Sequence, residues 1–90
     1  RGTVTGVVTD QTGAGVPGAK VELRNQLTNV DRVTSTTEGG VYRFDAVELG
    51  DYTITVSNQG FTTFVRRGLP VQAGQTSNLD VKLEVGQTST

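Results

Sequence analysis

The chain has 90 residues, enough for one small domain, with eight basic and nine acidic side chains and a formal charge of -1. It has no cysteine and no histidine, which excludes disulfide bridges, thiolate or imidazole zinc sites and histidine-based catalytic triads. The basic residues form no block and no apolar run approaches the roughly 20 residues that span a bilayer, so we expect neither nucleic-acid binding nor membrane insertion.

The first half of the chain shows the period-2 alternation that is typical of strands exposed to water on one face. Residues 2–10 place valines on one face and mostly threonines on the other, and turn residues rich in glycine follow in 10–18. The alternation is unbroken in residues 19–25. After a polar connector, residues 33–37 predict a weak strand.

Residues 39–61 contain four of the five aromatic residues of the chain, which the pattern places on inward faces. Tyr42 and Phe44 share one face of the next predicted strand, and residues 52–58 alternate so strongly that we expect a central strand. Residues 60–71 form an extended segment whose proline restricts it to a sheet edge or a strand start. Residues 77–85 predict a closing strand with its leucines and valines on one side, Val85 included.

Together these segments predict seven short strands, no helix and a two-sheet antiparallel β-sandwich. We expect large apolar side chains from residues 42–61 to form the middle of the core. They are Tyr42, Phe44, Val47, Leu49, Tyr52, Ile54, Val56 and Phe61.

Four segments taken in order resemble the carboxypeptidase regulatory-like domain. They are GTVTGVVTDQTGAGVPGAKVELRN, TSTTEGGVYRF, LGDYTITVSNQGF and VQAGQTSNLDVKLEVGQ. The most specific features are Gly-x-Tyr at 50–52, Gly-Phe at 60–61 and Pro-Gly-Ala at 17–19. The resemblance implies an all-β, seven-stranded antiparallel Greek-key β-sandwich of the prealbumin (transthyretin-like) type, with the domain in residues 1–85 and a polar tail or linker in 86–90.

Residues 60–90 are similar in particular to the N-terminal extension of Oar-like TonB-dependent outer-membrane receptors. This resemblance implies a periplasmic module of a larger outer-membrane protein, with an extracellular location as the alternative. The expected role is a non-catalytic structural or protein-interaction module that is monomeric in isolation. Its expected partner is a protein, either the rest of its own receptor or another periplasmic protein, reached through loops or through the sheet edges at 33–37 and 61–71.

Two related families have covalent chemistry that this sequence does not support. Hydroxyisourate hydrolase, which resembles transthyretin, uses histidines and a C-terminal Tyr-Arg-Gly-Ser, and neither is present. We therefore expect no enzymatic activity, no catalytic residue and no cofactor. Cna protein B-type domains form an isopeptide bond from a lysine in a dry core, whereas Lys20 and Lys82 are predicted to face water.

The remaining candidate sites are loop carboxylates and an aromatic side chain beside two arginines. Asp45, Glu48 and Asp51 could supply oxygen ligands to calcium, but they lack EF-hand spacing and we assign no metal site. Phe64, Arg66 and Arg67 form the candidate interaction surface, although adjacent arginines on a strand face opposite ways. An exposed Phe64 would favour the alternative function, a carbohydrate-binding accessory module of a secreted or cell-surface protein, whereas a half-buried Phe64 would be structural.

Overall fold

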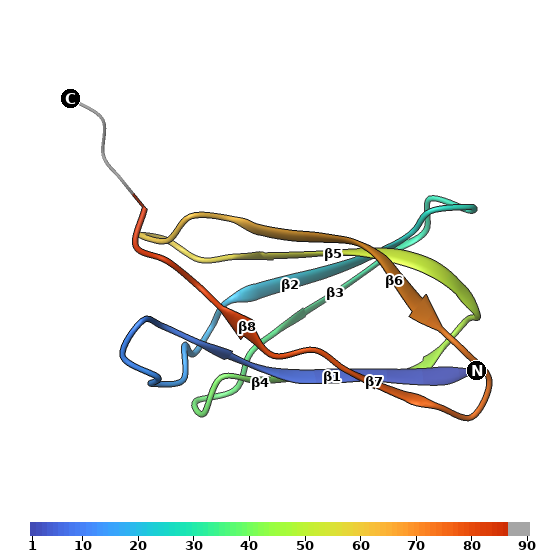
Figure 1. Cartoon of the computed structure of the whole chain (residues 1–90), viewed down its shortest axis with the longest axis horizontal. Coiled ribbons are helices and arrows are strands. Elements are labelled where there is room, and N and C mark those ends of the chain that lie inside the picture. The colour runs from blue at the N-terminus through green and yellow to red at the C-terminus, as the bar shows by residue number, and fades with distance from the viewer. Residues whose placement is uncertain (87–90) are drawn as a thin grey trace.

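The computed structural model describes residues 1–86 and shows two β-sheets packed face to face (Figure 1). Within those residues no helix exists that could cross a membrane. The strands are β1 (Gly2–Thr9), β2 (Lys20–Asn25), β3 (Asp31–Ser35), β4 (Val41–Val47), β5 (Gly50–Ser57), β6 (Phe64–Val71), β7 (Thr76–Asn78) and β8 (Val81–Lys82). Of the predicted polar tail at 86–90, all but the first residue lies outside the described part of the chain.

One sheet has the order β4-β1-β7, with β8 also paired to β1, and the other has the order β3-β2-β5-β6. In Figure 1 the second sheet forms the upper layer and β1, β4 and β7 form the lower one. The predicted all-β sandwich is confirmed. Residues 1–86 contain eight strands rather than the seven predicted, because the closing segment is interrupted. Its two halves run parallel to β1, while the other strand pairs in this part of the chain are antiparallel.

The interruption lies after β7, where Leu79 crosses Gly6 of β1. The Leu79 N–H donates to the Thr5 carbonyl (2.9 Å) and the Tyr42 hydroxyl donates to the Leu79 carbonyl (2.5 Å). A Cβ atom on Gly6 would lie 1.8 Å from the Leu79 carbonyl oxygen. Only glycine therefore permits this crossing, and the hydrogen bond from Tyr42 holds it.

The core contains most of the side chains that the sequence pattern placed there. Tyr42, Phe44, Val47, Tyr52, Ile54 and Val56 are buried, and Phe61 is partly buried against them. The prediction for Leu49 is wrong, because this residue lies in the short β4–β5 connection, outside both strands, and is 51% exposed. Val85 is also exposed, because it follows β8 and pairs with Phe61 at the margin of the sandwich.

The positions of the strands within the second sheet agree with their sequence patterns. β5 lies between β2 and β6, so the predicted central strand is confirmed. β3 and β6 are the two edges of this sheet, as predicted, although β3 ends at Ser35. Its predicted continuation stops because the Thr36 side chain turns inward, where it donates to the Val16 carbonyl (2.6 Å) and accepts from the Ala19 N–H (2.8 Å).

The buried phenol of Tyr42 should make stability depend on pH in the alkaline range. Burial, and secondly the negative charge of Asp80, raise the pKa of Tyr42 to about 12, whereas an unfolded tyrosine titrates near 10. The native state keeps its proton where the unfolded state loses it. The contribution of Tyr42 to the free energy of unfolding is therefore fully present below about pH 10. It falls by about 2 to 3 kcal/mol as pH rises to about 12.

Urea unfolding at about pH 9 and about pH 12 measures this loss, with Tyr42→Phe as the control. The variant lacks the titrating hydroxyl, so its stability should fall less across the same interval. Equal losses in the two proteins would contradict the assignment.

Candidate functional site

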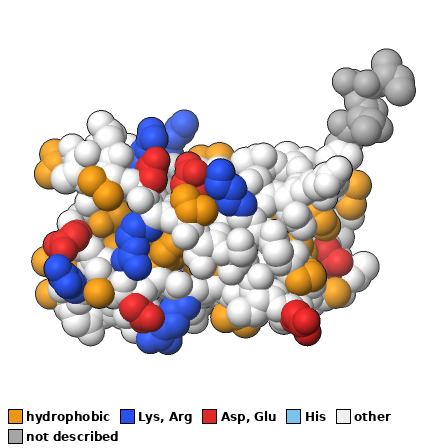
Figure 2. All heavy atoms as spheres, turned by 180° about the vertical axis from the view of Figure 1, so that it is seen from behind, with side chains coloured by type: hydrophobic (Ala, Val, Ile, Leu, Met, Phe, Trp, Pro, Cys, Tyr) orange, Lys and Arg blue, Asp and Glu red, His pale blue; other side chains and the backbone are white. Residues whose placement is uncertain are grey.

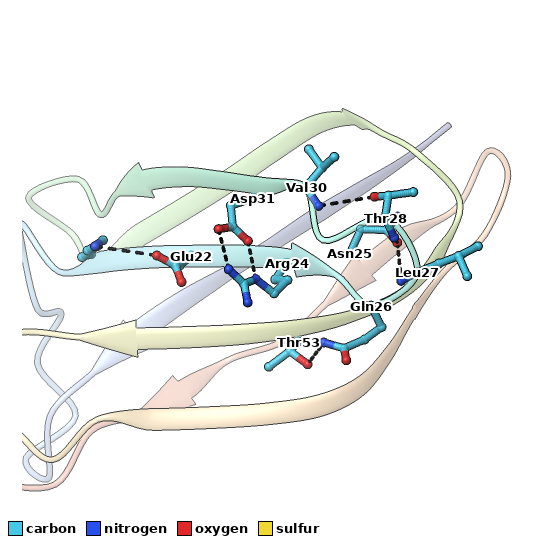
Figure 3. Close-up of polar contacts among 10 residues, drawn as sticks. Glu22, Arg24, Asn25, Gln26, Leu27, Thr28, Val30, Asp31 and Thr53 are labelled. Carbon is cyan, nitrogen blue, oxygen red and sulfur yellow. Dashed lines mark hydrogen bonds and ion pairs between the residues drawn. The ribbon is translucent and has the colours of Figure 1, made fainter.

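The tip of the β2–β3 hairpin is a turn that the buried side chain of Asn25 organises. Its carbonyl oxygen accepts the N–H groups of Leu27 (2.9 Å) and Thr28 (3.1 Å), and its amide nitrogen donates to the Tyr52 hydroxyl (3.1 Å). Asn29 has a φ of 59°, a conformation that asparagine tolerates better than most residues. The turn leaves the Leu27 side chain 91% exposed and pointing away from the strands (Figure 3).

The β4–β5 connection lies opposite this turn and is held by the same tyrosine. The Tyr52 hydroxyl donates to the Glu48 carbonyl (2.8 Å), and the next residue, Leu49, is exposed. The connection follows a bulge in which Ala46 has a φ of 53°, a strained value for a residue with a Cβ. One buried phenol thus fixes both loops relative to each other.

A cleft of about 530 Å³ lies between the two loops. The hairpin tip, the β4–β5 connection and the N-terminus meet at this end of the sandwich, on the right of Figure 1. The lining residues are Arg1, Asn25, Leu27, Thr28, Val30, Arg32, Ala46, Glu48, Leu49 and Tyr52. Leu27 also borders a second hollow of about 350 Å³, so its side chain forms a ridge between two depressions. We call the group of Leu27, Val30, Arg32 and Leu49 the end surface.

The end surface combines apolar side chains with a cation that has no acidic partner among residues 1–86. Val30 is 59% exposed, comparable to Leu49. The Arg1 Nε atom lies 3.1 Å from Glu48 Oε1, whereas Arg32 donates from Nη1 to the Asp45 carbonyl (2.7 Å) and forms no ion pair within the described chain. Figure 2 shows basic, acidic and hydrophobic side chains intermingled in the left half of the face it presents.

A bidentate ion pair closes the stem of the same hairpin. Arg24 Nε and Nη2 donate to the two carboxylate oxygens of Asp31, at 2.7 and 3.0 Å (Figure 3). This hydrogen-bonded guanidinium lowers the pKa of Asp31, so the contribution of the pair to stability is present at neutral pH and is lost as Asp31 becomes protonated in acid. The two hydrogen bonds of this bidentate pair favour one relative position of the two strands at the stem of the hairpin.

The predicted interaction residues Phe64, Arg66 and Arg67 lie elsewhere, on the edge strand β6. Phe64 is half-buried against the core and borders a hollow of about 300 Å³ whose other lining residues are Thr62, Thr63, Lys82 and Glu84. Both arginines are exposed, and neither lines this hollow. The register places Arg66 opposite Ile54, whereas Arg67 precedes Gly68 in a bulge. The structure therefore does not gather the three side chains into one site.

The remaining sequence predictions concern charged residues. Asp45 Oδ1 contacts Arg43 Nε at 2.7 Å, Glu48 pairs with Arg1, and residues 1–86 contain no cluster of three or more potential metal ligands. The predicted orientation of the lysines is confirmed, because Lys20 and Lys82 are both exposed.

The end surface was not predicted from the sequence, although one signal of it was present. Leu27 is an isolated leucine within the polar connector QLTNVDR, a position where turn chemistry favours polar residues. An apolar side chain that neither a strand nor a core requires is a candidate contact residue. Arg32 gave no comparable signal, because its cleft exists only in the folded chain.

Comparisons with known proteins agree with this architecture. Residues 3–84 match the carboxypeptidase regulatory-like domain family. No curated protein matches the chain in sequence.

Several solved structures share the fold. The TIE protein of Bacillus anthracis is 20% identical with a TM-score of 0.77, and the match covers 92% of this chain and 16% of that one. A protein assigned to carbohydrate binding from Bacteroides uniformis is 25% identical with a TM-score of 0.73, covering 91% and 40%. One chain of an interface-mutant type II cohesin–X-dockerin complex from Acetivibrio cellulolyticus is 16% identical with a TM-score of 0.76, and the match covers 96% of this chain and 59% of that one. The chain thus spans between 16% and 59% of the length of these structures.

Proposed function

Because the chain belongs to the carboxypeptidase regulatory-like domain family, we propose that it is a non-catalytic module that binds another protein. We further propose that it acts in the periplasm as the N-terminal extension of an Oar-like TonB-dependent outer-membrane receptor. The support for this setting is the similarity of residues 60–90 to such extensions. Its partner is then the rest of its own receptor or another periplasmic protein.

The observation that carries the protein-binding role is the end surface. Leu27, Val30 and Leu49 expose apolar side chains at one end of the sandwich, where no requirement of the fold places them. Exposed apolar groups that gather in one place mark contact sites. Asn25 and Tyr52 already order the loops that carry them, so a partner would bind without a large loss of loop entropy.

The loop end is a better docking site than either edge of the β3-β2-β5-β6 sheet. The β6 edge contains Pro70, which has no N–H to donate, and a bulge at Gly68. The β3 edge is only five residues long and lies beside the charged pair of Arg24 and Asp31. Short, charged or bulged edges discourage the addition of a foreign strand.

NMR titration of the isotope-labelled chain with the receptor that lacks this domain tests the proposal. Shift changes should centre on Leu27, Val30 and Leu49. Leu27→Asp should weaken binding about tenfold or more, because it places a charge at an apolar contact. Val65→Asp, at a 49% exposed valine of β6, is the matched control and should leave affinity unchanged. Equal effects of the two substitutions would count against the end surface.

Carbohydrate binding by an accessory module of a secreted or cell-surface protein is the second candidate. The half-burial of Phe64 itself favours a structural role, but the polar hollow that Phe64 borders, lined also by two threonines, a lysine and a glutamate, favours carbohydrate binding. The similarity to the Bacteroides uniformis protein supports it further. A glycan array followed by Phe64→Ala tests this role. A ligand that shifts resonances around Phe64, and whose binding the substitution abolishes, would favour it over protein binding.

A further inference from the structure

We propose that the end surface binds a polypeptide segment in which a large apolar side chain stands next to a carboxylate, and that Arg32 pairs with this carboxylate. The inference rests on the proposed protein-binding role and specifies the chemistry of the partner. It identifies Arg32 as the residue that selects an acidic segment.

Arg32 is held at the mouth of the cleft by contacts that leave its charge uncompensated. It stands opposite Leu23 in the β2–β3 register, so its side chain lies on the inward side of the edge strand. The guanidinium carbon is 5.7 Å from the centre of the Phe44 ring, and Nη1 donates to the Asp45 carbonyl at 2.7 Å. These contacts orient the planar group, and its other N–H groups are available for a bidentate interaction with a carboxylate.

The charges of the cleft support an acidic partner. Its lining contains two cations, Arg1 and Arg32, and one anion, Glu48, which gives a net charge of one positive unit. Glu48 is already paired with Arg1. A partner that covered Arg32 without an opposite charge would desolvate a cation without compensation, which is unfavourable. A carboxylate on the partner removes this penalty.

The shape of the end surface indicates a polypeptide rather than a small molecule. The Leu27 side chain is 91% exposed and protrudes between the two hollows of about 530 and 350 Å³. A small ligand inside the cleft would leave most of this side chain in water. A chain that crosses the tip covers Leu27 on both sides and can place successive side chains in the two hollows.

A random dodecapeptide library displayed on phage provides the test. Selection is performed on the folded chain, with phage that also bind the Leu27→Asp variant removed. We expect enriched sequences that contain Asp or Glu beside a large apolar residue. Representative peptides are then synthesised in pairs that differ only by Asp to Asn or Glu to Gln, and their affinities are measured by NMR titration.

The neutral peptide of each pair should bind the native chain about tenfold more weakly than the acidic one. The Arg32→Gln variant should bind the two peptides with equal affinity, because it lacks the guanidinium that pairs with the carboxylate. Arg67→Gln removes the same charge from an exposed site on β6 and should preserve the tenfold difference. Spectra of both variants establish that the fold is retained.

Three outcomes would overturn the inference. They are a selection that enriches nothing, enriched sequences without an acidic bias, and a preference for acidic peptides that survives Arg32→Gln. None of these decides the proposed function, since a folded partner that depends on Leu27 and ignores Arg32 would leave the protein-binding role intact. Conversely, if the receptor does not bind in the titration above, the proposed partner is excluded, while the preference for acidic peptides can still hold.

Discussion

Gly6→Ala is expected to leave little or no folded protein. The added Cβ would lie 1.8 Å from the Leu79 carbonyl oxygen and 2.8 Å from the Tyr42 hydroxyl oxygen. Both obstacles are fixed, one being backbone and the other a buried ring. Overpacking costs about 1 to 3 kcal/mol or more, and separating Tyr42 from Leu79 leaves buried polar groups unpaired at a cost of about 1 to 3 kcal/mol. A loss of about 4 kcal/mol approaches the whole stability of a small domain, roughly 5 to 15 kcal/mol.

Far-ultraviolet circular dichroism and urea unfolding measure this effect. Gly39→Ala is the matched control, because a Cβ there would meet no atom within 4 Å and the residue has no positive φ. The control should unfold near the native midpoint. A Gly6→Ala protein with native-like stability would show that the Leu79 crossing can move away from β1.

Tyr52→Ala is expected to lower the free energy of unfolding by about 3 to 5 kcal/mol. The ring is 4% exposed and belongs to the core, so its removal loses buried apolar area and leaves a cavity. The hydroxyl also connects the two loops of the end surface, through Asn25 at 3.1 Å and the Glu48 carbonyl at 2.8 Å. This substitution should therefore weaken both the core and the binding site.

Tyr52→Phe separates the two contributions. It keeps the ring and should cost about 1 to 3 kcal/mol, because the buried Asn25 amide and the Glu48 carbonyl lose their partner. Amide exchange of Leu27 and Thr28 should become faster, since Asn25 then holds the turn less firmly. A loss below about 1 kcal/mol in Tyr52→Ala itself would mean that the ring is not part of the core.

Much of the fold could be predicted because strand patterns are local. Alternation in 19–25 and 52–58 identified β2 and β5 and their inward faces, and the proline of 60–71 identified an edge. The errors lie where local alternation ends. Leu49 continues the pattern of β4 in sequence but lies in the β4–β5 connection, outside both strands, and is exposed.

The candidate site could not be assembled in the same way. Leu27, Arg32 and Leu49 come from a hairpin tip, an edge strand and a different connection, and only Leu27 stands out in its own segment, as a leucine in a polar connector. Their proximity follows from the register of β2 with β5, which sets Asn25 opposite Tyr52. No local pattern encodes that register.

The amino-acid sequence by itself determined the strand segments and their inward faces, because side chains alternate across any extended backbone with a period of two. It also removed thiol and imidazole chemistry, through the absence of cysteine and histidine. Only the tertiary structure decided that the last strand is divided where Leu79 crosses Gly6, and that one tyrosine joins two loops around a cleft. These features depend on contacts between residues far apart in the chain, whose geometry is set when the two sheets pack and not by any single segment.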